Sequence, residues 1–347
     1  MSSSSLLSFD VLGWDSSWAD AFASHAAGGL SAGRVLRVDR GQCDVATAAG
    51  PVRAEFSRTE VCTGDWVALS GCSVHAVLPR RTALVRASAS GVSAGQVLAA
   101  NVDVVAVVIA CTAEVDLGRA ERLLALAWES GARPVVVLTK ADACPDVGAV
   151  LEQIAGVALG VDVVVVSAAD GTGLDVLAAE LTGTIVLVGQ SGVGKSTLAT
   201  ALTGVDLAVR DVRAADGKGR HTTVRREMLG LRGGRGVLID TPGLRGVGLF
   251  DVQDGLSRAF ADVDALAADC RFGDCAHGGE PGCAVAEAIE AGVLPARRLE
   301  SYRKLIRENE WAAARTDARL RAERRAKERS MHRQYRDHWN RPGRGRR

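Results

Sequence analysis

Aromatic residues make up only 4% of this 347-residue sequence, and it has no long uninterrupted apolar run. A membrane-spanning helix needs about 20 apolar residues in a row, so we expect none. Residues 1–15 lack a basic start and an apolar stretch, so we expect no signal peptide and a cytoplasmic location. With 47% apolar residues the chain can still bury a sizeable core, mainly of Val, Leu and Ala, divided among two or three domains.

The formal net charge is only +1, but the charges are unevenly distributed. Residues 315–347 hold 13 Lys and Arg against 4 Asp and Glu, a local charge of +9, so the remainder carries −8. A basic tail on an acidic body favours a polyanionic partner at that end. The alternative is a solvated helix that only aids solubility.

Three of the eight cysteines lie close together with a histidine, in the pattern Cys270-x₄-Cys275-x-His277-x₅-Cys283. Thiolates with one imidazole suit tetrahedral Zn²⁺, and four protein ligands would close the shell, so the pattern predicts one structural zinc. The alternative is three free thiols and a surface histidine. The scattered cysteines are expected to be small buried apolar residues: Cys43, Cys62, Cys72, Cys111 and Cys144.

Residues 1–29 form a Ser/Ala-rich extension with Trp14 and Trp18, which we expect to pack on a neighbouring part of the chain. Residues 30–88 predict a small antiparallel barrel of the five-stranded OB type, because the β-type runs are short and separated by Gly, Asp or Ser. Such a barrel can bind nucleic acid or be purely structural, and both alternatives stay open. The predicted strands are 34–38, 43–47, 52–56, 66–70 and 74–78. The arginines of this region are Arg34, Arg37, Arg40, Arg53, Arg58, Arg80, Arg81 and Arg86.

Residues 89–250 predict an α/β domain, because near-continuous apolar runs alternate with helical stretches. That alternation is typical of a parallel sheet covered on both faces. Residues 251–347 predict a mostly helical zinc-binding domain that ends in the basic tail. The strands expected in the sheet are 102–110, 134–140, 161–167, 184–189 and 236–240.

Residues 189–196, GQSGVGKS, match the phosphate-loop pattern G-x-x-x-x-G-K-[ST] between a strand and a helix. Glycines let backbone N–H groups surround an anion at the positive end of the helix. We expect Lys195 to reach the β- and γ-phosphates and the Ser196 hydroxyl to ligate Mg²⁺. The other loop residues expected to bind nucleotide are Gly189, Ser191, Gly192, Val193, Gly194 and Thr197.

Two segments that precede this loop favour guanine as the base. Residues 139–142, TKAD, look like the N/T-K-x-D motif of GTPases, although threonine stands where asparagine is more usual. Asp142 can accept hydrogen bonds from guanine N1–H and N2–H₂, and adenine has no donors there. Residues 167–173 resemble the S-A-x-x-G-x-G element. The strand ends should share one sheet edge. The residues assigned to the base are Thr139, Lys140, Asp142, Ser167 and Ala168.

Two further segments are candidate nucleotide switches. Residues 240–243, DTPG, match D-x-x-G, in which Asp240 would hold Mg²⁺ through water and the Gly243 N–H would meet the γ-phosphate. A threonine of residues 219–223, GRHTT, should complete the Mg²⁺ shell, with Thr223 slightly favoured over Thr222. The order along the chain is therefore base, phosphate loop, switches, whereas ordinary GTPases begin with the phosphate loop. Because termini of compact domains often lie close together, one sheet permits both orders.

These motifs together resemble the family of ribosome small subunit-dependent GTPase A (RsgA), circularly permuted bacterial GTPases. The likeness covers about residues 30–335 and includes VCTGDWVAL, GQSGVGKST, GRHTT, DTPG and CRFGDCAHGGEPGCAV. It implies an OB barrel, a permuted GTPase domain and a zinc domain. It also implies binding to the immature small ribosomal subunit and its rRNA, and GTP hydrolysis that the subunit stimulates. The extension at residues 1–29 is not explained by it.

The resemblance also assigns His221 to positioning the attacking water. Leu244, which follows D-x-x-G, is apolar and cannot orient water, so another group must do so. A surface histidine in a loop is the alternative. With Lys195 and Asp240, His221 completes the expected catalytic set.

Rival functions stay open at this point. The chain could be an RNA-binding assembly module whose nucleotide only switches conformation, an ATPase, or a GTPase acting on DNA or in metal handling. We expect slow intrinsic hydrolysis, GTP and GDP as ligands, a monomer and no membrane partner.

Overall fold

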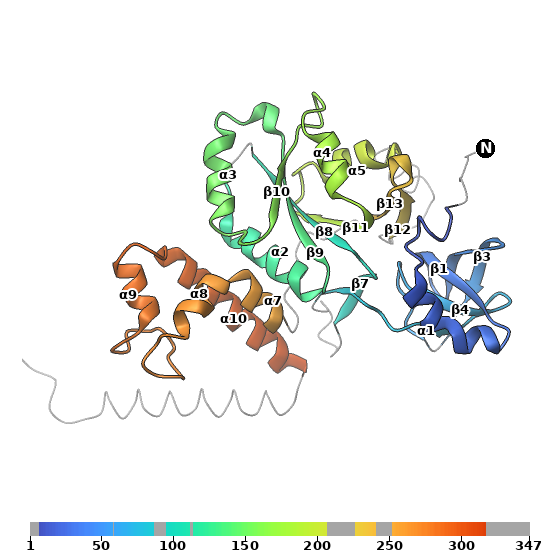
Figure 1. Ribbon diagram of the computed structural model, residues 1–347, viewed down its shortest axis with the longest axis horizontal. Coiled ribbons are helices and arrows are strands. Elements are labelled where there is room, and N and C mark those ends of the chain that lie inside the picture. The colour runs from blue at the N-terminus through green and yellow to red at the C-terminus, as the bar shows by residue number, and fades with distance from the viewer. Residues whose placement is uncertain are drawn as a thin grey trace, which may run out of the picture.

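The chain folds into three parts that lie side by side in the computed structural model (Figure 1). The structure describes residues 7–57, 59–86, 95–111, 114–206, 226–240 and 252–316. A β-barrel comes first, an α/β sheet lies in the middle, and a group of helices that holds the Cys/His segment comes last. Within those ranges no helix is both long and apolar enough to cross a bilayer.

The first part is a closed five-stranded barrel, as predicted. Its sheet order is β1-β2-β3-β5-β4, and β4 returns to pair with β1. Apolar side chains of these strands, such as Val35, Val45 and Val67, fill a core of their own. The strands are β1 (Ser31–Val38), β2 (Gln42–Thr47), β3 (Gly50–Glu55), β4 (Trp66–Ser70) and β5 (Ser73–Val77).

The described part of the N-terminal extension folds onto the barrel around Trp66. Helix α1 (Ser16–Ala27) begins at Asp15, whose carboxylate accepts the N–H of Trp18 at 2.9 Å. The rings of Trp14 and Trp18 lie 4.6 Å and 6.2 Å from the Trp66 ring, centroid to centroid. Trp18 and Phe22 of the extension are buried, as is Trp66 of β4. The extension therefore adds large aromatic side chains to the core around the barrel, in a sequence that has few of them.

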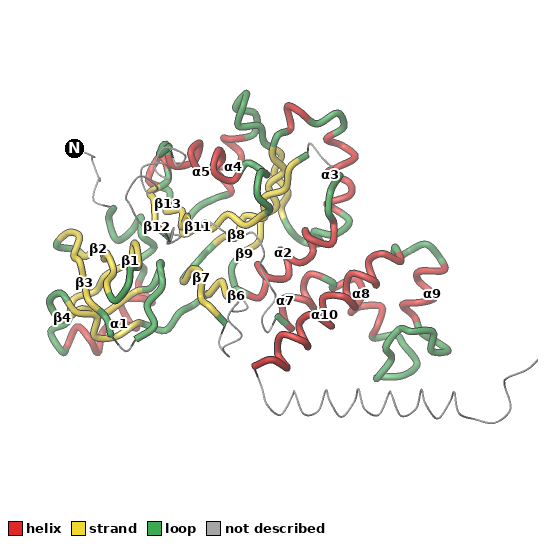
Figure 2. Tube along the Cα trace, turned by 180° about the vertical axis from the view of Figure 1, so that it is seen from behind, coloured by secondary structure: helices red, strands yellow, loops and turns green. Residues whose placement is uncertain are grey.

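The central sheet places five parallel strands in the order β10-β9-β8-β11-β13, followed by antiparallel β12. Helices cover both faces (Figure 2), and successive strand residues alternate between two cores. All five predicted strands are confirmed. They are β8 (Val104–Ala110), β9 (Arg133–Thr139), β10 (Asp162–Val165), β11 (Gly183–Gly189) and β13 (Gly236–Asp240). The covering helices are α2 (Leu117–Glu129), α3 (Val147–Ala155), α4 (Leu174–Glu180) and α5 (Lys195–Thr203).

Strand β12 (Glu227–Gly230) and the hairpin of β6 (Ala83–Arg86) and β7 (Gln96–Ala100) were not predicted. β12 matters because it joins the barrel to the central sheet. Glu227 lies opposite Asp240 of β13 on one side and opposite Arg37 of barrel strand β1 on the other. The two sheets are therefore one continuous sheet of eleven strands.

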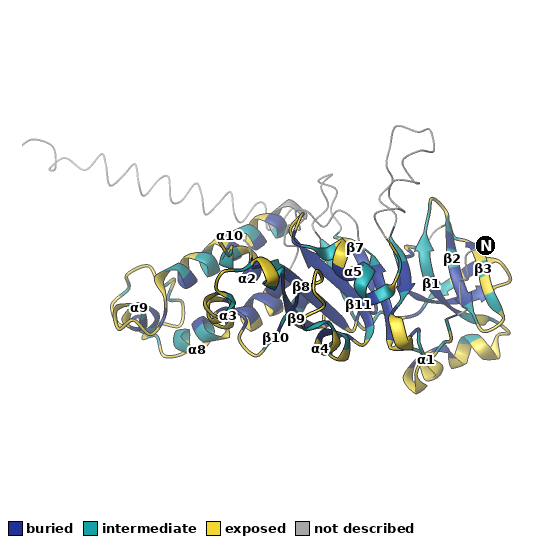
Figure 3. Ribbon diagram, turned by 90° about the horizontal axis from the view of Figure 1, so that it is seen from above, coloured by how far each residue is buried: buried dark blue, intermediate teal, exposed yellow. Residues whose placement is uncertain are grey.

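The last part packs its helices on α2 of the central domain. The close approach of α7 depends on Gly255, since a Cβ there would lie 2.1 Å from the Ala125 carbonyl oxygen. Buried residues concentrate on the central strands and at this helix contact, whereas outer helix faces are exposed (Figure 3). The helices are α7 (Gln253–Ala259), α8 (Ala261–Ala267), α9 (Ala284–Glu290) and α10 (Ala296–Thr316).

A buried ionic cluster ties α10 to α2. Glu121 of α2 is fully buried and accepts hydrogen bonds at 2.8 Å from both Arg297 and Arg298. It also accepts the Ser301 hydroxyl. Arg298, 1% exposed, pairs in addition with Asp262 at 2.9 Å through two nitrogens. Glu121 and Arg298 depend on these contacts most, because an unpaired charge at their depth is very costly.

Candidate nucleotide and metal sites

The phosphate loop has the backbone that its glycines predict. It follows β11 and leads into α5, with Gly189, Gly192 and Gly194 at positive φ. A Cβ on Gly189 would lie 2.4 Å from the Val108 carbonyl oxygen, so only glycine fits there. The Lys195 ammonium donates to the carbonyls of Gly189 at 2.9 Å and Gln190 at 2.6 Å. The lysine therefore lies over the mouth of its own loop. Ser191, Ser196 and Thr197 are exposed beside it.

The base-side strand touches the phosphate loop through Thr139. Its hydroxyl oxygen lies 2.6 Å from the Val193 carbonyl and 3.2 Å from the Ile109 carbonyl. Thr139 is 5% exposed, so these contacts are well shielded from water. The threonine thus connects β9 directly to the phosphate loop.

The two predicted guanine segments also meet. The Ser167 hydroxyl donates to a carboxylate oxygen of Asp142 at 2.7 Å, while it accepts the N–H groups of Ala169 and Asp170. Lys140, with φ of +58°, turns the chain so that Asp142 is exposed at the sheet edge. One Asp142 oxygen is oriented by the serine, and a carboxylate held this way can accept a pair of donors from a guanine edge.

Asp240 ends β13 at the same edge, because the parallel register of β8, β9, β11 and β13 brings their carboxyl ends together. The structure therefore gathers Thr139, Asp142, Lys195 and Asp240 along one side of the sheet. The switch residues His221, Thr222, Thr223 and Gly243 lie outside the described residues, as do residues 317–347 of the basic tail.

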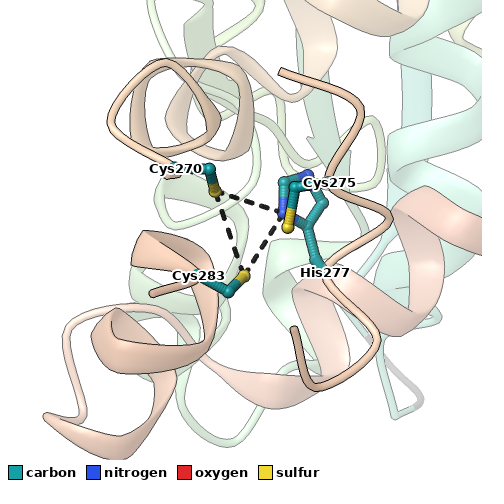
Figure 4. A group of neighbouring side chains, drawn as sticks. All are labelled: Cys270, Cys275, His277 and Cys283. Carbon is teal, nitrogen blue, oxygen red and sulfur yellow. Dashed lines mark hydrogen bonds between the residues drawn. The ribbon is translucent and has the colours of Figure 1, made fainter. Parts of the chain in front are cut away.

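The four residues of the Cys/His segment converge on one point (Figure 4). The His277 Nδ1 atom lies 3.6 Å from the Cys270 sulfur and 3.5 Å from the Cys283 sulfur, and those sulfurs are 3.9 Å apart. All four donor atoms, that of Cys275 included, lie within 4.8 Å of one another. Ligands of a tetrahedral zinc with Zn–S bonds of about 2.3 Å are separated by about 3.8 Å, so the residues fit the ion.

Local hydrogen bonds favour the thiolate form of one cluster residue, Cys270. Burial works against ionisation of Cys270, but the N–H groups of Val285 and Ala284, together with the neighbouring thiols, outweigh it and lower the pKa of Cys270. Those N–H groups belong to the first turn of α9, where Cys283 is the N-cap. A thiolate is the form that binds a metal, so this position favours an ion.

The barrel arginines are largely engaged within the protein. Arg34 is buried over the Trp66 ring and donates to the Asn101 carbonyl at 3.0 Å. Ion pairs with aspartates hold Arg37, Arg53, Arg80 and Arg81. Arg86 donates to Gln96. Most of the basic character seen in the sequence therefore stabilises the barrel and its contacts. Of the scattered cysteines, Cys72 is exposed and Cys144 half-buried, contrary to expectation, whereas Cys43, Cys62 and Cys111 are buried.

The phosphate loop lies between a strand and a helix, and the strands that carry the base-side residues precede it in the sequence on the same parallel sheet. This arrangement defines a circularly permuted P-loop GTPase. The family model "RsgA GTPase" matches residues 77–250. The chain is 58% identical over 327 residues to the small ribosomal subunit biogenesis GTPase RsgA of Streptomyces coelicolor, covering 90% of this chain and 89% of the relative. The chain therefore belongs to the RsgA GTPase family.

Solved structures agree on the fold. YjeQ from Thermotoga maritima is 25% identical with a TM-score of 0.61, covering 80% of this chain and 98% of that one. YloQ, described as a circularly permuted GTPase, is 20% identical with a TM-score of 0.59, covering 80% of this chain and 94% of that one. Both likenesses support the barrel-plus-permuted-sheet architecture.

Proposed function

We propose that this GTPase binds the immature small ribosomal subunit, assists its late maturation, and is released when subunit-stimulated hydrolysis converts GTP to GDP. The observation that carries the proposal is the meeting of base-side and phosphate-side elements through Thr139 and Val193. Support for the target comes from the S. coelicolor relative, whose name is a small ribosomal subunit biogenesis GTPase. Action on ribosomal subunits would make the protein cytoplasmic.

In the proposed mechanism, catalysis comes from positioning and charge neutralisation, because phosphoryl transfer needs little covalent help from a protein. Lys195 neutralises the γ-phosphate, and Asp142 holds the base so that the phosphates reach the loop. A magnesium ion held by Ser196, a switch threonine and Asp240 would screen charge on the phosphates. His221 would orient the water, since Leu244 cannot.

We propose zinc as the ion of the Cys/His cluster, in a structural role. Three thiols and one imidazole are a donor set typical of closed zinc sites. The cluster lies in the helical part, away from the sheet edge that carries the nucleotide residues (Figure 1). We further propose that the domains of this chain begin at residues 30, 89 and 251. We also propose that the protein is a monomer.

We also propose that the basic tail at residues 315–347 contributes most of the attraction to rRNA. Its local charge of +9 contrasts with the barrel region, in which Arg37, Arg53, Arg80 and Arg81 are paired with aspartates. Binding carried by such a tail should weaken steeply as salt rises. We therefore favour a purely structural role, and not nucleic-acid binding, for the face of the barrel that carries these ion pairs.

Asp142→Asn is expected to remove the preference for GTP over ATP. The asparagine amide has one acceptor fewer than the carboxylate and places an N–H₂ group opposite the guanine donors. GTP affinity should therefore fall by about 10- to 100-fold, because hydrogen bonds to charged groups contribute about 1.5–3 kcal/mol. Titration calorimetry with GTP and ATP measures this. Xanthosine triphosphate, which has an oxygen where guanine has its amino group, should rescue binding. Asp175→Asn, an exposed carboxylate in α4, is the matched control.

Sedimentation with purified small ribosomal subunits tests the proposed target. The protein with a non-hydrolysable GTP analogue should comigrate with the subunits, and GTP should release it after turnover. Turnover should also rise well above the intrinsic rate, which for unassisted GTPases is about 10⁻² s⁻¹ or slower. Comigration without any stimulation of turnover would instead favour a nucleotide-switched RNA-binding module with negligible catalysis.

A further inference from the structure

The metal cluster depends on an unusual turn at His277. This residue has φ of +57°, a left-handed conformation that residues other than glycine adopt infrequently. The turn directs the imidazole Nδ1 toward Cys270 and Cys283 (Figure 4). If the turn relaxed to an ordinary conformation, the imidazole would point elsewhere and one of four donors would be lost. Contacts that stabilise this turn therefore also stabilise the donor set.

Glu280 holds the N–H side of that turn. Its carboxylate accepts the backbone N–H of Ala276 at 3.2 Å and that of Gly278 at 2.5 Å, the two residues that flank His277. The Oε2 atom also lies 3.7 Å from the Cys275 sulfur. A single side chain thus holds the N–H groups of both residues that flank the histidine and contacts a second donor residue.

Arg303 holds the carbonyl side of the same turn from a different element. Its guanidinium, on α10, donates to the Ala276 carbonyl at 3.1 Å and to the His277 carbonyl. The carbonyls of Ala276 and His277 and the N–H groups of Ala276 and Gly278 are consequently bound from two directions. Because α10 also carries Arg298, which pairs with Glu121, the turn is fastened to a helix that is itself anchored on the central domain.

We propose that Glu280 and Arg303 are positioning residues of the metal site, which hold His277 in its ligating conformation and so raise the affinity of the cluster for zinc. The inference rests on the structural zinc proposed above. Neither side chain belongs to the four-residue donor set. Partners that orient metal ligands typically change metal affinity by about 10- to 100-fold when removed.

The test uses the full-length chain, stripped of metal and then titrated with Co²⁺. The ligand-field bands of Co²⁺ report tetrahedral coordination by sulfur and nitrogen. Displacement of the bound Co²⁺ by Zn²⁺ then gives the affinity for zinc. Glu280→Gln and Arg303→Met are each expected to weaken both metals by about 10- to 100-fold. At saturation they should keep one ion per chain and the parent spectrum, because the four donors remain. Glu290→Gln and Arg307→Met, exposed positions in α9 and α10, should match the parent.

Each outcome bears on a different step. Parent-like affinity in both Glu280→Gln and Arg303→Met would overturn the positioning role while leaving the metal site intact. Failure of the parent itself to bind one Co²⁺ or Zn²⁺ would overturn the metal site first. A changed spectrum at saturation in Glu280→Gln would make Glu280 a ligand, which also contradicts the proposal. Because the two variants act from different elements, misfolding of one, seen by circular dichroism, leaves the other decisive.

Discussion

Lys195→Ala is expected to reduce GTP turnover by at least about 10²-fold, the cost of removing one preorganised electrostatic contact to a developing charge. The ammonium lies at the mouth of the phosphate loop, bound to the carbonyls of Gly189 and Gln190. On the proposed mechanism it exchanges these carbonyls for the γ-phosphate, whose charge grows in the transition state. Single-turnover measurements of phosphate release, with and without small subunits, provide the readout.

Lys304→Ala, which removes an exposed cation on α10, is the matched control and should leave turnover unchanged. If Lys195→Ala hydrolyses GTP as fast as the parent, the phosphate loop is not the catalytic centre. The nucleotide would then serve only as a conformational ligand, and the assembly-module alternative would replace the enzyme mechanism.

Glu121→Ala is expected to destabilise the chain by up to about 3–5 kcal/mol, the cost of removing one partner of a buried ion pair. Glu121 is fully buried, and its removal leaves Arg298, itself 1% exposed, with Asp262, whose side chain is 26% exposed, as its remaining carboxylate partner among the described residues. The ion pairs connect α2 with α10, so the helical part should loosen from the central domain as well. Urea unfolding followed by tryptophan fluorescence measures the loss in stability.

Glu300→Ala, an exposed acid on α10, controls for loss of charge alone and should change stability by less than about 0.5 kcal/mol. A double variant that replaces both Glu121 and Arg298 by apolar residues should recover part of the loss, because no lone charge stays buried. An unfolding midpoint for Glu121→Ala equal to that of the parent would show that the cluster does not hold these helices together.

The sequence predicted the sheet well because long apolar runs and glycine-bounded loops are local signals. The five central strands, the barrel strands and the phosphate loop all lie where these patterns indicated. Spacing alone also identified the Cys/His cluster. Such features depend on residues close together in the chain, so one sequence suffices to find them.

Contacts between distant segments were not predictable in the same way. Strand β12 has only four residues, and its pairing with β1 depends on a register that joins residues 37 and 227. Similarly, nothing local shows that the Thr139 hydroxyl reaches Val193, or that Arg34 is buried against Trp66. The charge count did not show that Arg80 and Arg81 are paired, because their aspartate partners, Asp65 and Asp15, lie far from them in the sequence.

A crystal structure with a non-hydrolysable GTP analogue and Mg²⁺ tests the central claim most directly. The account predicts that one nucleotide spans the sheet edge, with the Asp142 carboxylate hydrogen-bonded to guanine N1–H and N2–H₂ and the Lys195 ammonium bound to the β- and γ-phosphates. Guanine bound away from Asp142, or phosphates bound outside residues 189–196, would contradict it.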